Sequence, residues 1–341
     1  MKQLPLKLAG SISRRRLNTA LAAWPLASLA GLAQAAKVAA PVSAPSVLRI
    51  GFQKSAVNLV ILKQQGTLEQ RFPNSKVQWV EFPAGPQLLE ALAVGSLEFG
   101  MTGDSPPVFA QAAGKDLLYV GAEPAKPLSS AVLAPAGSPL NTLADLKGKR
   151  VALQKGSSAH YLVVRALEQA KLQWSDIEPA YLTPSEARAA FERGAVDAWG
   201  IWDPFYAAAE LAIKPKVLST GAGLSSNNSF YLASKPFVEQ HPQAVQALLD
   251  ALTMADANVQ NQRKESAQLI SDFSGLSLAT VHLFLSRRPV SPVAPLTASI
   301  TADQQRVADA FFKLELIPRA IKVADIVWQG DRTPGASVAQ R

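Results

Sequence analysis

Short apolar segments that end in a glycine- or serine-bearing turn and lead into a helical stretch recur along most of this chain. In the clearest case, Arg150–Leu153 is a candidate buried strand, Gly156 and two serines form the turn, and the run from Tyr161 to Leu167 has the apolar spacing of a helix packed on a sheet. Strands that alternate with helical stretches of about 10 to 15 residues favour parallel sheets with helices on both faces. The pattern therefore restricts the fold to the α/β class.

This alternation occurs in two series, which meet at about residue 130. We expect strands at 47–52, 76–82, 97–101, 117–121, 131–134, 150–153, 180–182, 197–201, 216–219 and 229–233. We expect helices at 56–65, 87–94, 108–113, 142–147, from 157 onward, and at 184–193, 242–262 and 301–314. The sequence therefore predicts two lobes, one built from residues 47–130 and 229–341, which include the C-terminal helices, and one built from residues 131–228.

The first 35 residues have the order of a secretory signal peptide. A basic segment without acidic residues, including three arginines at 14–16, precedes an Ala- and Leu-rich stretch and then the small-residue sequence at 33–35. Residues 13–17 resemble a twin-arginine signal, and the general secretory route would suit them as well. Residues 36–46, rich in Ala, Pro, Val and Ser, are expected to form a linker. The mature protein is thus predicted to be periplasmic.

The formal charge of +8 would favour a polyanionic partner, but most of it lies in the predicted signal peptide. Removing residues 1–35 takes away five basic residues and no acidic ones, which leaves 29 Lys and Arg against 26 Asp and Glu and a formal charge of +3. We therefore expect no nucleic-acid partner. The apolar N-terminal stretch is also too short to argue for a membrane span.

Ligands of open α/β sheets bind beyond the carboxyl ends of the strands. There the first turn of a helix presents free N–H groups and the positive end of the helix dipole, which suits a small anion. An ordinary capped helix needs no ligand, so a single junction decides little. Four such junctions, two in each predicted lobe, could face one another across a cleft: 53–55, 102–104, 156–158 and 202–204.

Residues that enzymes use for catalysis are sparse in this chain. It has no cysteine, its three histidines are widely separated, and it lacks the Gly-x-Ser-x-Gly, Gly-x-Gly-x-x-Gly and Walker-type loops. We therefore expect no cofactor, no metal ion and no enzymatic activity. His160 could reach the cleft or face solvent. Asp104 and Asp203 are better explained as N-caps than as general bases, and Trp202 at a strand end could contact an apolar ligand.

Several longer runs of the sequence match a known pattern. They are LRIGFQKS (48–55), WVEFPAGPQLLEAL (79–92), TGDSPPVFAQAAGKDLLYVGAEPAKP (102–127), LQKGSSAHYLVVRAL (153–167), YLTPSEARAAFERGAVDAWGIWDPFYAAA (181–209) and SFYLA (229–233). These runs resemble the periplasmic aliphatic sulfonate-binding proteins, the solute receptors of sulfonate ABC importers. The resemblance implies a two-lobed, type II periplasmic binding protein-like α/β fold with mixed sheets flanked by helices. It also implies a hinge near Ser129–Ala131 and Asn227–Ser229.

The resemblance further implies a sulfonate headgroup held between the lobes. A sulfonate is permanently ionised and singly charged, so N–H and hydroxyl donors at helix starts can satisfy its oxygens without a full countercharge. No arginine clamp is expected. The residues expected at the headgroup are Gln53, Gly103, Asp104 through its backbone, Ser105, Ser157, Ser158 and His160, and those expected at the organic tail are Glu123, Trp202 and Asp203. The implied partners are a sulfonate and the membrane permease of an ABC importer, and the receptor is expected to be a monomer.

Other ligands and activities are alternatives at this point. Within the binding proteins they are taurine, an aryl sulfonate or sulfate ester, nitrate and a thiamine precursor. Glu123 or Asp203 could hold the ammonium group of an aminosulfonate. The same fold also carries enzymes, among them a desulfinase and a pyrimidine synthase. The desulfinase uses a cysteine nucleophile, and this chain has no cysteine.

Overall fold

The computed structural model describes residues 42–289 and 293–330, which belong to one compact unit. The predicted signal peptide, with its twin-arginine sequence, and residues 36–41 of the predicted linker lie outside the described residues. The rest of the linker, up to Ser46, has no helix or strand. Within the described ranges, no helix combines the length and the apolar composition that crossing a membrane requires.

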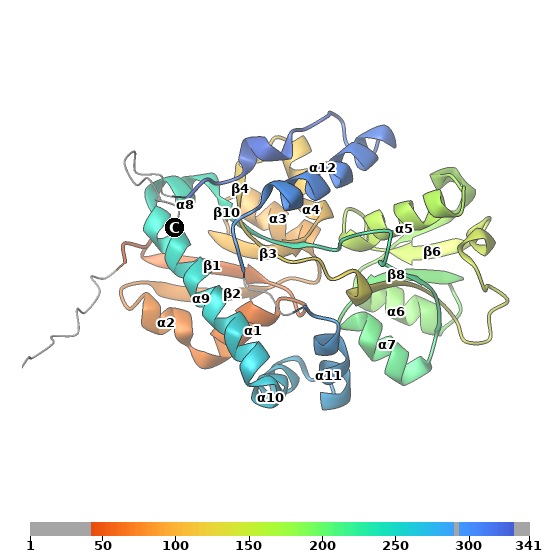
Figure 1. The fold of residues 1–341 in the computed structure, drawn as a ribbon, viewed down its shortest axis with the longest axis horizontal. Coiled ribbons are helices and arrows are strands. Elements are labelled where there is room, and N and C mark those ends of the chain that lie inside the picture. The colour runs from red at the N-terminus through yellow and green to blue at the C-terminus, as the bar shows by residue number, and fades with distance from the viewer. Residues whose placement is uncertain (1–41, 290–292, 331–341) are drawn as a thin grey trace, which may run out of the picture. The chain divides into compact units, whose positions relative to one another are not determined.

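The first of two sheets has the strand order β2-β1-β3-β10-β4 (Figure 1). Its strands are β1 (Val47–Phe52), β2 (Lys76–Glu81), β3 (Phe99–Gly103), β4 (Leu117–Glu123) and β10 (Ser229–Ser234). The second sheet has the order β7-β6-β8-β5-β9. Its strands are β5 (Ser130–Ala134), β6 (Arg150–Leu153), β7 (Glu178–Tyr181), β8 (Ala198–Trp202) and β9 (Lys216–Thr220). The two sheets therefore repeat one arrangement, with β6, β7 and β8 in the places of β1, β2 and β3.

One strand in each sheet runs against its neighbours. β1 pairs in parallel with β2 and β3, and β6 pairs in parallel with β7 and β8. By contrast, β10 is antiparallel to β3 and β4, and β5 is antiparallel to β8 and β9. The local pattern, which favours parallel pairing, does not account for β5 and β10, whereas the mixed sheets that the resemblance implies are confirmed. Each of these strands follows a crossing between the sheets, so it starts at the edge where the parallel strands end and runs the opposite way.

Helices cover both faces of each sheet, which confirms the predicted α/β class with mixed sheets. They are α1 (Val57–Gln65), α2 (Thr67–Arg71), α3 (Gly85–Ala93), α4 (Ser105–Ala112), α5 (Ser158–Gln169), α6 (Pro184–Glu192), α7 (Phe205–Ile213), α8 (Lys235–Gln240), α9 (Pro242–Asn261), α10 (Arg263–Ser274), α11 (Leu278–Ser286) and α12 (Ala298–Lys313). Four short 3-10 helices also occur in the described residues: η1 (Pro127–Ser129), η2 (Leu143–Leu146), η3 (Trp174–Asp176) and η4 (Val323–Ile326). The predicted helix at 142–147 is thus a 3-10 helix.

Alternation along the central strands produces two cores for each sheet, because successive side chains of a strand point to opposite faces. In β10, Tyr231 and Ala233 join the core formed with α1, α9 and α10, whereas Phe230 and Leu232 join the core formed with α4 and α12. In the second sheet, Val132 packs with α5, and Leu133 packs with α6 and α7. The C-terminal helices α9 to α12 therefore pack with the first sheet, which rigidly supports the ends of its strands.

The chain crosses between the sheets twice, from β4 through η1 into β5 and from β9 into β10. Backbone hydrogen bonds join the two crossings: Lys126 N–H donates to the Ser226 carbonyl (2.9 Å) and Gly221 N–H donates to the Pro127 carbonyl (3.0 Å). The crossings lie side by side at the positions where the sequence predicts a hinge. Hinge motion itself stays a prediction.

Candidate functional site

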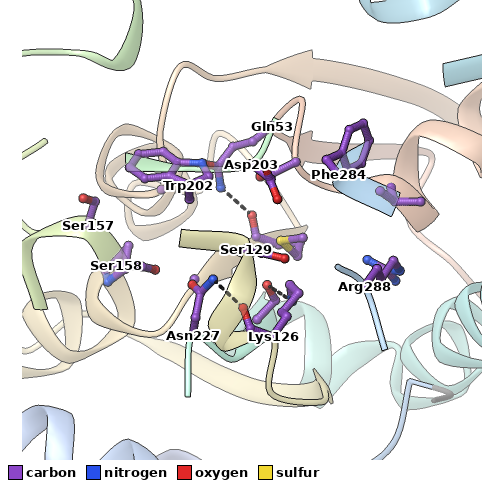
Figure 2. Close-up of a pocket in the computed structure, with 17 residues that line it drawn as sticks. Gln53, Lys126, Ser129, Ser157, Ser158, Trp202, Asp203, Asn227, Phe284 and Arg288 are labelled. Carbon is purple, nitrogen blue, oxygen red and sulfur yellow. Dashed lines mark hydrogen bonds between the residues drawn. The ribbon is translucent and has the colours of Figure 1, made fainter. Parts of the chain in front are cut away.

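A cavity lies between the two sheets, at the carboxyl ends of β1, β3, β6 and β8 (Figure 2). Its volume is about 60 Å³, which is room for several water-sized groups. Ser157 and Ser158 lie on one side of it, and Phe284 and Arg288 on the other. The wall consists of Gln53, Ser55, Val57, Gly85, Met101, Gly103, Pro106, Lys126, Ser129, Ser157, Ser158, Trp202, Asp203, Asn227, Ser229, Phe284 and Arg288.

The helices α1, α3, α4, α5 and α7 all begin at this wall or within two residues of it. Each helix start carries N–H groups that have no partner within the helix, together with about half a positive charge from the helix dipole. The first turn of α4 contributes fewer donors because Pro106 and Pro107 have no N–H. The twelve-residue α5, with Ser157 as its N-cap, has no such restriction. The arrangement directs several helix starts at one small cavity.

Neutral side-chain donors supplement the helix starts. The amide of Gln53 donates to the Met101 carbonyl (3.0 Å), and the amide of Asn227 donates to the Lys126 carbonyl (3.2 Å). The hydroxyl of Ser157 donates to the Gln154 carbonyl (2.7 Å). These bonds fix the orientation of the side chains at the wall. An amide has two N–H groups, so Gln53 and Asn227 each retain one N–H for a ligand oxygen.

Gly103 and Ser158 bring the two lobes into close contact at the cavity. A β-carbon built on Gly103 would lie 1.9 Å from the Oγ of Ser158, which belongs to the other lobe. A side chain at position 103 would have to displace the Ser158 hydroxyl while the lobes are this close, so glycine is favoured here for a steric reason rather than for its backbone angles. The contact closes the cavity between β3 and α5.

A buried ion network supports the opposite wall. Arg288 donates to both carboxylate oxygens of Glu123 (3.1 Å each) and to Asp256 (3.0 Å). Lys126 donates to Glu123 (3.0 Å) and to Ser229 (2.7 Å). The hydroxyl of Tyr231 also donates a hydrogen bond to Glu123 (2.7 Å). Two carboxylates and two cations therefore neutralise one another directly behind the wall.

The charges in this network stabilise each other's ionised forms. Burial alone would raise the pKa of Glu123, but Arg288 and Lys126 lower that pKa well below its ordinary value. Burial lowers the pKa of Lys126, and Glu123 counteracts the effect. The Nε of Arg288 is buried and has no hydrogen-bond partner among the described residues. Because a buried donor without a partner is costly, a ligand oxygen or a water at the wall would satisfy it.

Asp203 is the only acidic side chain in the wall as described. It accepts the Ala207 N–H (3.0 Å), as expected of a carboxylate at a helix start, and two hydrogen bonds from Arg287 (3.1 and 3.3 Å). Burial raises the pKa of Asp203 to about 6, although Arg287 lowers it in part. Because Asp203 is already paired, it is not a free partner for a cationic ligand.

The wall also has an apolar portion. Val57, Met101, Pro106, Trp202 and Phe284 line the cavity together with the polar donors. Trp202 is in edge contact with the ring of Phe205, with centroids 6.4 Å apart. A ligand with an anionic head and an apolar tail would match this division of the wall.

Six of the ten predicted ligand-binding residues line the cavity. They are Gln53, Gly103, Ser157, Ser158, Trp202 and Asp203. Glu123 lies behind the wall in the ion network. Asp104 and Ser105 are buried, and the Ser105 hydroxyl donates to the Asp104 carboxylate (2.9 Å). Burial raises the pKa of Asp104, although Ser105, Ser158 and Ser225 oppose the rise, so this carboxyl is turned toward serine hydroxyls.

His160 is buried beside the cavity rather than in its wall. Its ring packs against Trp174 (centroids 4.8 Å apart) and Phe311 (5.2 Å), and its Nδ1 accepts the Gly156 N–H (3.1 Å). Burial lowers its pKa to about 3, with a smaller contribution from Lys155. His160 is therefore neutral, and it joins aromatic residues of the two lobes. Neither prediction for His160, the cleft or the solvent, describes this position.

Sequence reasoning missed Lys126, Asn227 and Arg288. Lys126 and Asn227 belong to the crossings, where no strand-to-helix junction marks them. Arg288 follows α11 and lies 165 residues after Glu123 in the sequence, although the two side chains are in contact at the cavity. No arginine clamp was expected, and Arg288 does line the wall. The paired sequence Arg287-Arg288 just after an apolar helix is the one signal that could have suggested it.

The site offers no evident catalytic chemistry. The chain has no cysteine, and in residues 42–289 and 293–330 no three His, Asp or Glu side chains are grouped so that they could hold a metal ion. The charged groups at the wall are each paired with a residue outside it, Asp203 with Arg287, and Lys126 and Arg288 with Glu123. The arrangement can bind, orient and enclose a small amphiphilic anion.

The chain is similar to binding proteins over almost its entire described length. Residues 76–266 match the family model "NMT1/THI5 like". An Escherichia coli (strain K12) relative, named for the binding of aliphatic sulfonates, is 47% identical over 309 residues, which cover 90% of this chain and 97% of that protein. The crystal structure of the periplasmic aliphatic sulphonate binding protein SsuA from Escherichia coli has a TM-score of 0.78 and 47% identity, and covers 87% of this chain and 97% of that one. The alkanesulfonate-binding protein SsuA from Xanthomonas axonopodis pv. citri, solved with MOPS bound, has a TM-score of 0.81 and 48% identity, and covers 84% of this chain and 99% of that one.

Proposed function

The chain belongs to the family of aliphatic sulfonate-binding proteins, and we therefore propose that it captures an alkanesulfonate in the cavity between its lobes and delivers it to the permease of an ABC importer. The single observation that carries the proposal is the convergence of five helix starts on one small cavity, where the two cations of the wall, Lys126 and Arg288, are already paired with Glu123. A sulfonate has one delocalised charge and three acceptor oxygens. Helix N-termini and amide or hydroxyl donors match such a group without requiring a full countercharge.

In this proposal the headgroup is bound by Gln53, Gly103, Ser157, Ser158 and Asn227. Arg288 adds its unpartnered Nε. The aliphatic tail contacts Trp202, Phe284 and Met101, which form the apolar portion of the wall. Four predicted residues act from behind the wall. Asp104 and Ser105 hold serine hydroxyls in place, Glu123 holds the cations, and His160 packs with aromatic rings.

The proposed role is that of a receptor and includes no chemical step. The relatives reported above are binding proteins, and the chain lacks the cysteine that a desulfinase would use. We place the receptor in the periplasm as a monomer, with residues 1–35 as the export signal and residues 13–17 as its twin-arginine element. Lobe 1, from residues 47–130 and 229–341, and lobe 2, from residues 131–228, would close on the ligand about the two crossings.

Calorimetric titration of the mature protein with butane-1-sulfonate, sulfate and nitrate tests this function. We expect butane-1-sulfonate to bind, and sulfate and nitrate to bind more weakly because they have no tail for the apolar wall. Replacing both serines, Ser157→Ala and Ser158→Ala, should reduce binding by about 1–3 kcal/mol. The control variant Ser271→Ala with Ser274→Ala removes two hydroxyls of α10 that donate to backbone carbonyls away from the cavity. No binding of any alkanesulfonate would refute the function, and an unchanged affinity of the Ser157/Ser158 variant would refute the headgroup assignment.

A further inference from the structure

We propose that Arg287 is a positioning residue for ligand capture, which holds the two lobes together at the edge of the cavity without lining it. The proposal rests on the function proposed above. Arg287 is the C-cap of α11, which packs with the first sheet. Its partners Asp203, Tyr206 and Glu210 all belong to the end of β8 and to α7, in the second lobe. One side chain thus spans the two lobes.

Three different contacts hold this side chain. Its Nη1 donates to both oxygens of Asp203, at 3.1 and 3.3 Å, and its Nη2 donates to Glu210. The guanidinium carbon also lies 4.0 Å from the centre of the Tyr206 ring, the stacked arrangement that arginine favours. Tyr206 and Glu210 are four residues apart on α7 and so lie on one face of that helix, and Asp203 directly precedes its N-cap. The contact is therefore a built site rather than a chance surface pair.

Burial distinguishes this ion pair from the others at the surface. The side chain of Arg287 is 12% exposed and that of Asp203 is 6% exposed. By comparison, the surface pair Arg188 and Glu192 on α6 is 34% and 38% exposed. Exposed pairs contribute little because water screens them, whereas charged hydrogen bonds in a desolvated pair are stronger. Opening the lobes would return Arg287 to water, so the contact exists only while they are together.

The lobes also touch on the other side of the cavity, where aromatic rings meet in addition to Gly103 and Ser158. The ring of Phe311 in α12 packs against His160 (5.2 Å) and Tyr161 (5.9 Å) of α5. On the α7 side, α11 packs against α7 directly, and Arg287 provides the polar bond between them. The cavity lies between these two contacts. Arg287 therefore acts at one edge of the cavity and can close it after a ligand has entered.

The position of Arg287 in α11 links this contact to the cavity wall. Phe284 lies one helical turn before it and Arg288 directly after it, and both line the cavity. On the facing lobe, Asp203 is itself part of the wall and Trp202 precedes it. When Arg287 binds Asp203 and Glu210, the two halves of the wall are brought together around the ligand. The measured affinity is the intrinsic affinity multiplied by the fraction of molecules that are closed. A residue outside the cavity that changes this fraction therefore changes the measured affinity.

The test compares the parent with Arg287→Gln, Glu210→Gln and the control Arg188→Gln. Because the chain has no cysteine, two spin labels can be placed specifically through Gly137→Cys and Met254→Cys. Gly137 is exposed with open space around it, and Met254 is 65% exposed on α9. Distances between the labels are measured by pulsed electron resonance with and without butane-1-sulfonate, and Kd and the dissociation rate are measured on the unlabelled proteins.

We expect Arg287→Gln to raise Kd by about tenfold or more, mainly through faster dissociation. The fraction of molecules whose label-to-label distance matches this structure should also fall. Glu210→Gln should show the same changes to a smaller extent, and Arg188→Gln should match the parent. A Kd within about twofold of the parent, with unchanged distances, would overturn the proposal. If Arg287→Gln does not fold, Glu210→Gln decides the question by the same two criteria.

The experiment separates this proposal from the proposed function. If the parent binds no alkanesulfonate, the proposed function fails, and the distances measured without ligand still decide the role of Arg287. A closed population that is present in the parent and depleted in Arg287→Gln supports the role. Identical distances in the two proteins overturn it. If the parent binds butane-1-sulfonate and Arg287→Gln binds it equally well, only the role of Arg287 fails.

Discussion

The α-carbon of Gly103 faces the hydroxyl of Ser158 so closely that a β-carbon at position 103 would lie 1.9 Å from Ser158 Oγ. Gly103 ends a strand of the first sheet, and Ser158 begins a helix on the second. With Ser158 in this rotamer, the two lobes can approach this far because Gly103 has no side chain. The pair therefore limits how completely the cavity closes.

The variant Gly103→Ala should weaken binding of butane-1-sulfonate, because its methyl group keeps the lobes apart. Overpacking of this kind typically costs about 1–3 kcal/mol. Adding Ser158→Ala removes the clashing oxygen and leaves the nearest Ser158 atom, Cβ, at 3.3 Å. In calorimetric titrations the double variant should lose less binding free energy than the two single variants lose in total. Strictly additive losses would contradict the steric explanation.

Removing the charge of Glu123 should destabilise the protein at neutral pH. Glu123→Gln leaves Arg288 and Lys126 buried without this partner, at a cost of about 3 kcal/mol. Arg288 and Lys126 lower the pKa of Glu123 more than burial raises it, so its stabilising contribution is fully present above the ordinary value of 4.5 and is lost as the pH falls below that value. In urea unfolding, the difference in the free energy of unfolding between parent and variant should stay constant from pH 8 to about 5 and narrow toward pH 3.5. A gap of constant size at every pH would contradict this account.

Acid should destabilise the protein through His160. Burial lowers the pKa of His160 to about 3, while the ordinary value is 6.5. Between these values the unfolded chain binds a proton that the folded protein does not, so stability falls as the pH falls. The parent should lose up to about 1.36 kcal/mol per pH unit more than His160→Gln over the range from pH 6 to 4. Parallel unfolding free-energy curves for the two proteins would show that His160 is not neutral in the fold.

An aminosulfonate should bind more weakly than an alkanesulfonate of the same length, which has no ammonium group. Both carboxylates once considered for an ammonium group are occupied, Glu123 by Arg288 and Asp203 by Arg287. The ammonium of taurine would therefore lose its hydration without gaining a partner. We expect propane-1-sulfonate to bind at least about tenfold more tightly than taurine in calorimetric titrations. Equal affinities would mean that one of these carboxylates is available to the ligand.

The local patterns predicted most elements of the fold. The strands at 47–52 and 150–153 are found at the predicted bounds, because apolar residues flanked by turn residues define them. The helix predicted at 108–113 begins at Ser105 instead, since Pro106 and Pro107 fit the first turn of a helix. The directions of β5 and β10 were not predictable from local pattern. They depend on where the chain crosses between sheets, which is a property of the assembled fold.

The residues of the candidate site also fall into those that local patterns predict and those that depend on the assembled fold. Gln53, Gly103 and Ser157 were found because each follows a strand, and strand ends converge in an α/β sheet. Arg288 could not be found by that rule, because only the packing of α11 brings it to Glu123, 165 residues earlier in the chain. Lys126 was missed for a related reason, since its role depends on two crossings lying side by side. Contacts made by distant segments leave no periodic signal in the sequence.

The strands of the two sheets are distributed differently along the chain. All five strands of the second sheet come from the continuous segment 130–220, whereas the first sheet needs β10, which inserts between β3 and β4. A nascent polypeptide that stops before Ser229 leaves the facing edges of β3 and β4 exposed, and such edges readily pair with other molecules. Synthesis therefore completes the second lobe first. Of the residues that line the cavity, Ser229, Phe284 and Arg288 are the last to be synthesised.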